Sequence, residues 1–149
     1  MDYTEIIQKR FSVKDYDPSH EMSNDELVSL FEEVALTPTS FNLQHQKFVL
    51  VKDKELKEKI KAASWNQAQV TDCSALVIVL GKLNAHTDAE EIYAEAPQPV
   101  KDQLLPMIGG FYEGKDQLMR DEAIRSASLA GMTLMYSAFN MGYDSCPMI

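Results

Sequence analysis

The feature that most constrains this chain is a long helical pattern over residues 116–141. Its first half is charged, but from Ala127 onward it is apolar on almost every face. A helix that is apolar all round has to be buried on all sides, by its own domain or by another subunit. A helix of this length extends over about 39 Å. We therefore expect a long central helix, with the rest of the chain packed against it.

Two stripes of side chains follow the apolar half of this predicted helix. One consists of Ala127, Ala130, Leu134, Ala138 and Met141. The other consists of Ile124, Ser128, Gly131, Met135 and Phe139. A chain of 149 residues can cover one stripe, and a second copy would more easily cover the other. We favour a homodimer built on this helix over the alternative, in which segments 27–34 and 100–111 of the same chain enclose it.

Composition narrows the class of protein. The net charge is −9 and the pI is about 4.7, so the chain as a whole repels nucleic acid and anionic lipid. Hydrophobic residues make up 45% and charged residues 25%, which argues against disorder. Cys73 and Cys146 form no metal-binding spacing, and the N-terminal residues do not resemble a signal peptide. We expect a single domain over residues 1–149, located in the cytoplasm.

The remaining pattern predicts both helices and strands. Short apolar segments at 47–52 and 75–81 are predicted strands, and the second has the composition of a buried one. Ser23 and Glu26 form a capping signature, so a helix should follow and end before Pro38. Further helices are predicted at 2–9, at 53–63 as an exposed lysine-rich helix, at 66–72 and at 100–111, with a surface excursion or lid at 82–99.

The first candidate for chemistry is a basic segment near the N-terminus. Arg10, Ser12 and Lys14 alternate, so an extended backbone would place all three side chains on one face. Two cations and a hydroxyl on one face could bind phosphate or another anion. An exposed strand edge protected by charges explains the same spacing, and the spacing alone favours that simpler interpretation.

Two polar segments are further candidates. Residues 38–44, Pro-Thr-Ser-Phe-Asn-Leu-Gln, form a hydrogen-bonding loop suited to a polyol or the edge of a heterocycle, although ordinary loop composition explains them about as well. Asn66 and Gln69 are three apart, which on a helix puts two amides on one face. The histidines at 20, 45 and 86 are scattered, so we assign none to a metal, and no nucleophile with its base is evident.

Taken in order, these segments resemble the FMN-dependent nitroreductase family. The resemblance rests on Arg-Phe-Ser-Val-Lys-Asp-Tyr at 10–16, on the loop at 38–44, and on Trp-Asn-Gln-Ala-Gln-Val at 65–70. It rests also on the small-residue helix that ends in Gly142-Tyr143, followed by Cys-Pro-Met-Ile at 146–149. The resemblance implies an α+β fold with a mostly antiparallel central sheet flanked by helices, and with the long helix at a dimer interface.

The resemblance also implies roles for individual residues. Arg10 and Ser12 would hold the FMN phosphate, and Lys14 would lie near the pyrimidine side of the flavin. Thr39, Ser40 and Asn42 would reach the flavin of the neighbouring subunit. Asn66 would contact the pyrimidine edge, with Gln69 where many members have lysine. The segment formed by Pro147, Met148 and Ile149 would line one face of the flavin.

The expected function is that of an FMN-dependent oxidoreductase. It would transfer a hydride from NAD(P)H through flavin N5 to an electron-poor acceptor such as a nitroaromatic or a quinone. The alternative is a non-catalytic flavin-binding or partner-binding protein of the same fold. His45-Gln46 replaces the common Pro-Trp of the family. Since the family continues beyond this point with a further strand, we expect residues 1–149 to be C-terminally incomplete.

Overall fold

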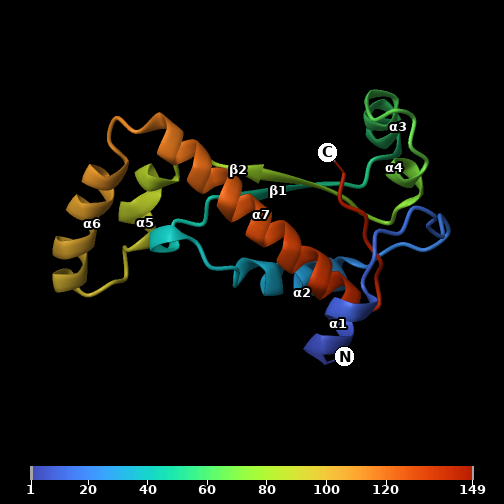
Figure 1. The fold of residues 1–149 in the computed structure, drawn as a ribbon, viewed down its shortest axis with the longest axis horizontal. Coiled ribbons are helices and arrows are strands. Elements are labelled where there is room, and N and C mark those ends of the chain that lie inside the picture. Colours follow the sequence, from blue (N-terminus) through green and yellow to red (C-terminus); the bar gives the residue numbers. More distant parts are fainter. Residues whose placement is uncertain (1, 149) are drawn as a thin grey trace. The chain divides into compact units, whose positions relative to one another are not determined.

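A computed structural model describes residues 2–148, which contain helices and a small sheet (Figure 1). The helices are α1 (Tyr3–Lys9), α2 (Asn24–Ala35), α3 (Lys54–Ala63), α4 (Gln69–Asp72), α5 (Ala89–Ile92), α6 (Gln98–Tyr112) and α7 (Asp116–Asn140), with 3-10 turns η1 (Ser40–Asn42) and η2 (Ala85–Asp88). The strands are β1 (Gln46–Val51) and β2 (Leu76–Gly81). This content confirms the predicted α+β class.

The two strands pair with each other in one sheet. The backbone N–H of Lys82, just after β2, donates to the carbonyl of His45, just before β1, at 2.7 Å. The end of one strand therefore lies beside the start of the other, so the pair is antiparallel. The prediction that β2 is fully buried was wrong, because Ile78 and Leu80 are 38% and 45% exposed. Ile78 and Leu80 are two residues apart and so lie on one face of the strand, which the described residues leave partly uncovered.

The chain divides into two compact units. The first unit comprises the residues up to Leu36, Phe48–Ile78 and those from Gly131 onward; the second comprises Thr37–Lys47 and Val79–Ala130. The strands and α7 each contribute residues to both units. We describe the interior of each unit separately.

In the first unit, α2 begins as the sequence predicts. Ser23 and Glu26 form a reciprocal capping box, in which each satisfies a backbone N–H of the other. The helix buries Leu27 and Leu30 in a cluster with Met22 and Ala138 of α7. Fully burying an apolar side chain of this size stabilises a fold by roughly 1.5–3 kcal/mol. This cluster ties the second half of α7 to the N-terminal part of the chain.

The lysine-rich helix α3 is not uniformly exposed, contrary to the sequence prediction. Lys57 is only 6% exposed, and its Nζ donates to the carbonyl oxygen of Cys73 at 2.5 Å. Cys73 is the residue at which α4 ends, so the ammonium satisfies a carbonyl at a helix C-terminus. An aliphatic stem with a cationic tip can serve an interior position in this way. Periodicity alone could not distinguish Lys57 from its exposed neighbours.

In the second unit, the core is built partly by residues 82–99, which the sequence predicts to be a surface excursion. That prediction was wrong: Ala85 and Ala89, in η2 and α5, are 0% and 6% exposed. They pack in a cluster with Leu43, Ile108 and Tyr112. Two alanines among polar residues do not form a recognisable hydrophobic pattern in the sequence. Their small size nevertheless lets the helices approach closely.

The long helix α7 is present as the sequence predicts and ends at Asn140, and Gly142 follows in the left-handed conformation with φ of +91°. The expected burial on all sides is not found within the described residues, because Leu129 is 46% exposed. This glycine turns the chain into an extended segment. There Ser145 forms an isolated parallel bridge with Ser12, and the N–H of Val13 donates to the carbonyl of Ser145 at 3.2 Å. Within residues 2–148, none of the helices has the length and apolarity that crossing a membrane requires.

Candidate functional site

The basic segment near the N-terminus lies against the segment that follows α7. The bridge between Ser12 and Ser145 keeps this part of the chain extended, as the alternation of Arg10, Ser12 and Lys14 predicts. The same bridge places Ser12 next to the segment that leads into Pro147 and Met148. Both segments belong to the first unit. Ile149 lies outside the described residues.

Arg10 has an atom that needs an explanation. Its Nη1 is shielded from solvent and has no hydrogen-bond partner within residues 2–148. Buried polar groups in folded proteins are nearly always hydrogen-bonded, and an unpaired charged donor is costly. An anionic group beside Arg10 would satisfy this donor, and a phosphate suits a guanidinium especially well. The residues at this position therefore fit the phosphate end of a nucleotide-like cofactor.

Gln69 approaches the same C-terminal segment. It is 7% exposed, and its Nε2 lies 3.7 Å from Cys146 Sγ and donates to Gln67 Oε1 at 3.0 Å. Tyr16, from the N-terminal basic segment, is influenced by the same cysteine: burial, together with nearby Cys146 and Cys73, raises the pKa of Tyr16 to about 12. Gln69 therefore lies beside the C-terminal segment, to which the N-terminal basic segment is bridged through Ser12 and Ser145.

Asn66 differs from the sequence prediction. It lies outside α4 with φ of +54°, beside Trp65 with φ of +52°, so it does not share a helical face with Gln69. Two successive left-handed residues turn the chain after α3, and asparagine tolerates that conformation better than most residues. Asn66 is exposed, whereas Gln69 is buried. Helical spacing was a misleading guide because the helix begins later than predicted.

The polar loop at 38–44 lies in the second unit and has an unusual backbone. Phe41, Asn42 and Gln44 have φ values of +51°, +51° and +49°. The N–H of Gln44 donates to Thr39 Oγ1 at 2.9 Å, which closes the loop. The side chain of Asn42 is exposed. Left-handed non-glycine residues are strained, and such strain is concentrated at functional sites.

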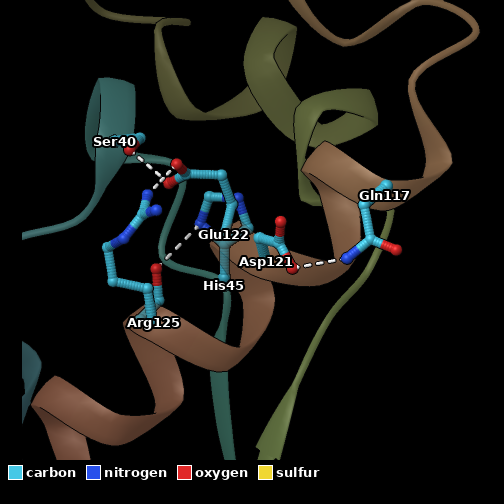
Figure 2. A network of polar contacts seen from close by, with 7 residues as sticks. Ser40, His45, Gln117, Asp121, Glu122 and Arg125 are labelled. Atoms are coloured by element: carbon cyan, nitrogen blue, oxygen red, sulfur yellow. Dashed lines mark hydrogen bonds and ion pairs between the residues drawn. The ribbon is translucent and has the colours of Figure 1, made fainter.

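A network of polar contacts built on the buried residues Glu122, His45 and Ser126 lies beneath this loop (Figure 2). Ser40 Oγ donates to Glu122 Oε2, and Arg125 Nη1 pairs with Glu122 Oε1. Glu122 is only 5% exposed. One turn further along α7, Ser126 Oγ lies 3.4 Å from Nδ1 of His45. Both contacts connect the loop region to one face of α7.

Electrostatics in this network favour neutral His45. The ring is 1% exposed, and its burial lowers its pKa, although Glu122 acts in the opposite direction. Burial has the larger effect, because desolvation penalises the imidazolium. Neutral imidazole has one ring nitrogen that accepts and one that donates, which suits a contact with the serine hydroxyl.

Sequence reasoning did not identify Glu122, Arg125, His45 or Ser126. A usable signal exists for two of them. Glu122 and Ser126 are four residues apart, and Ala130 follows after another four, so the three lie on one face of the helix. Ala130 and the adjacent Ala123 are almost fully buried. A charged residue within a buried stripe is unusual and marks a polar contact. The predicted site residues thus fall into two groups, with Arg10, Ser12, Lys14, Asn66, Gln69, Pro147 and Met148 in the first unit and Thr39, Ser40 and Asn42 in the second.

Comparisons with known proteins identify the family. The Nitroreductase family model matches residues 7–149. Protein DrgA of Synechocystis sp. (strain ATCC 27184 / PCC 6803 / Kazusa) is 43% identical over 150 residues, which cover all of this chain and 71% of DrgA. MhqN of Bacillus subtilis (strain 168), whose name assigns it provisionally to the NAD(P)H nitroreductases, is 39% identical over 155 residues, covering 99% and 75% of the two chains.

Comparison with solved structures leads to the same family. The Bacillus subtilis protein ydfN has a TM-score of 0.94 and 39% identity, with 99% of this chain and 74% of that chain covered. A protein from Exiguobacterium sibiricum 255-15, solved in complex with FMN, has a TM-score of 0.94 and 33% identity, covering 100% and 75%. These similarities confirm the nitroreductase-like fold that the motifs implied. The chain belongs to the nitroreductase family.

Proposed function

We propose that this protein is an FMN-dependent oxidoreductase that transfers a hydride from NAD(P)H to an electron-poor organic acceptor such as a nitroaromatic or a quinone. The observation on which this rests is the buried Nη1 of Arg10, which has no hydrogen-bond partner within residues 2–148 and lies near Ser12 on an extended segment bridged to Ser145. Family membership and the FMN complex of a relative at 33% identity support it. NAD(P)H is a cytoplasmic reductant, so we place the protein in the cytoplasm.

The residues of the first unit would bind and orient the cofactor. Arg10 and Ser12 would hold the phosphate, with a charge-assisted hydrogen bond from the guanidinium. Lys14 would lie near the pyrimidine side, where a cation favours the negative charge that reduction adds. Asn66 and Gln69 would supply amide contacts to the ring edge, and the segment Pro147, Met148 and Ile149 would cover one face. When bound, FMN supplies the hydride chemistry, so no side chain has to act as nucleophile.

The residues of the second unit would serve a flavin bound by another copy of the chain. We propose a homodimer in which Thr39, Ser40 and Asn42 complete the site of the partner. The burial of α7 supports this arrangement, because Ala130 and Ala138 on one stripe are 0% and 7% exposed whereas Ile124 on the other stripe is 51% exposed. Ile124 also lines a cavity of about 500 Å³ together with apolar Val79 and Leu83. A second copy would cover this surface.

The decisive experiment follows the flavin in the purified full-length protein. We expect a yellow protein, or a colourless one that takes up added FMN, whose flavin absorbance is bleached by NADH or NADPH under anaerobic conditions. Addition of a quinone or a nitroaromatic should then restore the oxidised spectrum. Bound flavin that neither nicotinamide reduces would instead favour the non-catalytic flavin-binding alternative, and failure to bind FMN would refute both.

A further inference from the structure

We infer that Glu122 is a positioning residue, which fixes the loop Thr39–Gln44 so that Asn42 is the side chain presented to the flavin. We refer to residues 39–44 as the Asn42 loop. The inference rests on the proposed function, because it assumes that this loop contacts flavin. It adds a residue of α7 that makes no direct contact with the cofactor, and it assigns different tasks to the polar residues of the loop.

The Asn42 loop is attached to the rest of the second unit on both sides. Before its centre, Ser40 donates to Glu122, and just after its end, His45 contacts Ser126. Glu122 and Ser126 are four apart on α7, so they lie on the same helical face. Between these contacts, Leu43 is 1% exposed and packs in the apolar core. The loop is thus held at Ser40, at Leu43 and next to its end at His45. The side chains of its other residues do not take part in these contacts.

The hydrogen bonds of the loop distinguish its polar side chains. Thr39 Oγ1 accepts the N–H of Gln44, and the hydroxyl of Ser40 donates to Glu122, so both shape the loop itself. Asn42 is exposed, and within residues 2–148 its amide makes no side-chain hydrogen bond. A free amide offers both donors and an acceptor, which suits a ribityl chain or a ring edge. Asn42 is therefore the residue of the three whose side chain is available to a ligand, whereas Thr39 and Ser40 would contribute to the partner's site by shaping the loop.

The strain of the backbone explains why a buried carboxylate is present. Non-glycine residues in the left-handed region persist only when the surrounding structure holds them there, and this loop has three. Burying a carboxylate costs free energy unless both oxygens are paired. Both are paired here, one with Ser40 and one with Arg125. A residue needed only for packing would be better apolar, so the carboxylate indicates a demand for defined loop geometry.

The test is a double-mutant cycle in the full-length protein, with FMN affinity measured by quenching of flavin fluorescence. We expect Asn42→Ala to weaken FMN binding about tenfold, and Glu122→Ala to weaken it by a similar factor. The double variant should be no weaker than the weaker single variant, because Asn42 contributes nothing once its loop has lost its position. Glu122→Gln retains an acceptor for Ser40 and should recover part of the affinity.

Controls separate positioning from general stability. Asp121→Asn alters an exposed acid next to Glu122 that accepts from Gln117 at 2.7 Å, and it should leave FMN affinity unchanged. If Glu122→Ala does not fold, Ser40→Ala replaces it in the cycle, because it removes the same contact while the buried carboxylate of Glu122 keeps its pairing with Arg125.

The outcomes are distinct. Independent, multiplicative losses from Asn42→Ala and Glu122→Ala, with normal binding by the unmutated protein, would overturn the positioning role and leave the proposed function intact. Unchanged affinity in Asn42→Ala would overturn the assignment of Asn42. Absence of FMN binding by the unmutated protein would refute the proposed function, and the inference with it.

Discussion

The hydroxyl of Tyr143, just beyond α7, donates to Glu26 Oε1 in the first turn of α2 at 2.6 Å. The other oxygen of the same carboxylate accepts the N–H of Ser23 at 2.8 Å in the capping box. The hydrogen bond from Tyr143, followed by those from Ser23, lowers the pKa of Glu26 from 4.5 to about 2. The same contact raises the pKa of Tyr143. One half-buried carboxylate therefore links α2 to the segment that follows α7 within the first unit.

This contact should be sensitive to acid. The pKa of Glu26 is lower in the folded chain than in the unfolded chain, so its contribution to stability is complete above about pH 4.5 and is lost as pH falls toward 2. We expect Tyr143→Phe to lower the melting temperature at pH 7. The difference from the unmutated protein should shrink as the pH falls from 5 to 2, as measured by circular dichroism.

Tyr93→Phe is the matched control for that experiment. The hydroxyl of Tyr93 donates to the backbone carbonyl of Phe41 at 2.7 Å, an acceptor that does not titrate. Its loss should lower the melting temperature by an amount that does not depend on pH in this range. If the two variants showed the same pH dependence, the role assigned to the Glu26 carboxylate would be wrong.

Gly81→Ala should destabilise the second unit. A Cβ at this position would lie 2.6 Å from the backbone oxygen of Ala123, and the helix backbone cannot yield as a flexible side chain would. Overpacking of this kind costs about 1–3 kcal/mol. Urea denaturation should show a lower midpoint with an unchanged slope.

Gly109→Ala provides the control, because a Cβ there meets nothing within 4 Å. Gly109 lies inside α6, where alanine is favoured over glycine by roughly 0.5–1 kcal/mol. This variant should be neutral or more stable in the same assay. A similar loss in both variants would show that the contact between Gly81 and Ala123 does not determine the effect.

Gly131→Leu tests the proposed dimer. Within the described chain, a Cβ at Gly131 meets nothing within 4 Å, so the first atom of the new side chain meets no obstacle in its own subunit. If α7 packs against a second copy, the added bulk should push the two subunits apart. We expect a shift from dimer toward monomer in light scattering, with a reduced flavin content. A variant that remains dimeric and retains its flavin would place the interface elsewhere.

Arg10→Ala tests the phosphate contact. Losing a charge-assisted hydrogen bond should cost about 1.5–3 kcal/mol, or roughly ten- to a hundredfold in FMN affinity, with little change in melting temperature. Lys9→Ala removes the neighbouring positive charge, which is 60% exposed and pairs with Glu5. It should alter the affinity by about twofold or less, since exposed pairs contribute little. Equal effects of both variants would indicate a general charge effect rather than a specific contact.

Local patterns in the sequence predicted much of this fold. The capping box at Ser23, both strands and the long helix with its terminal glycine follow from short-range rules, and the structure has each of them. The alternation of Arg10, Ser12 and Lys14 also predicted the extended segment. These features depend on a few neighbouring residues, so they can be recognised without knowledge of the tertiary contacts.

The features that the sequence did not reveal depend on distant partners. Lys57 is buried because it reaches the end of α4, and Ala85 is buried because η2 packs near Ile108. Glu122 resembles a surface acid until Ser40 lies beside it. Asn66 leaves the helical face because two left-handed residues precede α4. In each case a long-range contact or a backbone reversal overrode the local preference.

The parallel bridge between Ser12 and Ser145 has a consequence for biosynthesis. It joins residues that are far apart in the sequence, so closing it costs chain entropy, and contacts of this kind slow folding. A nascent chain that still lacks residue 145 already contains Arg10 and Ser12, but not the segment that pairs with Ser12. If Arg10 and Ser12 bind a phosphate as proposed, their site would therefore be complete only after residue 145 has been synthesised.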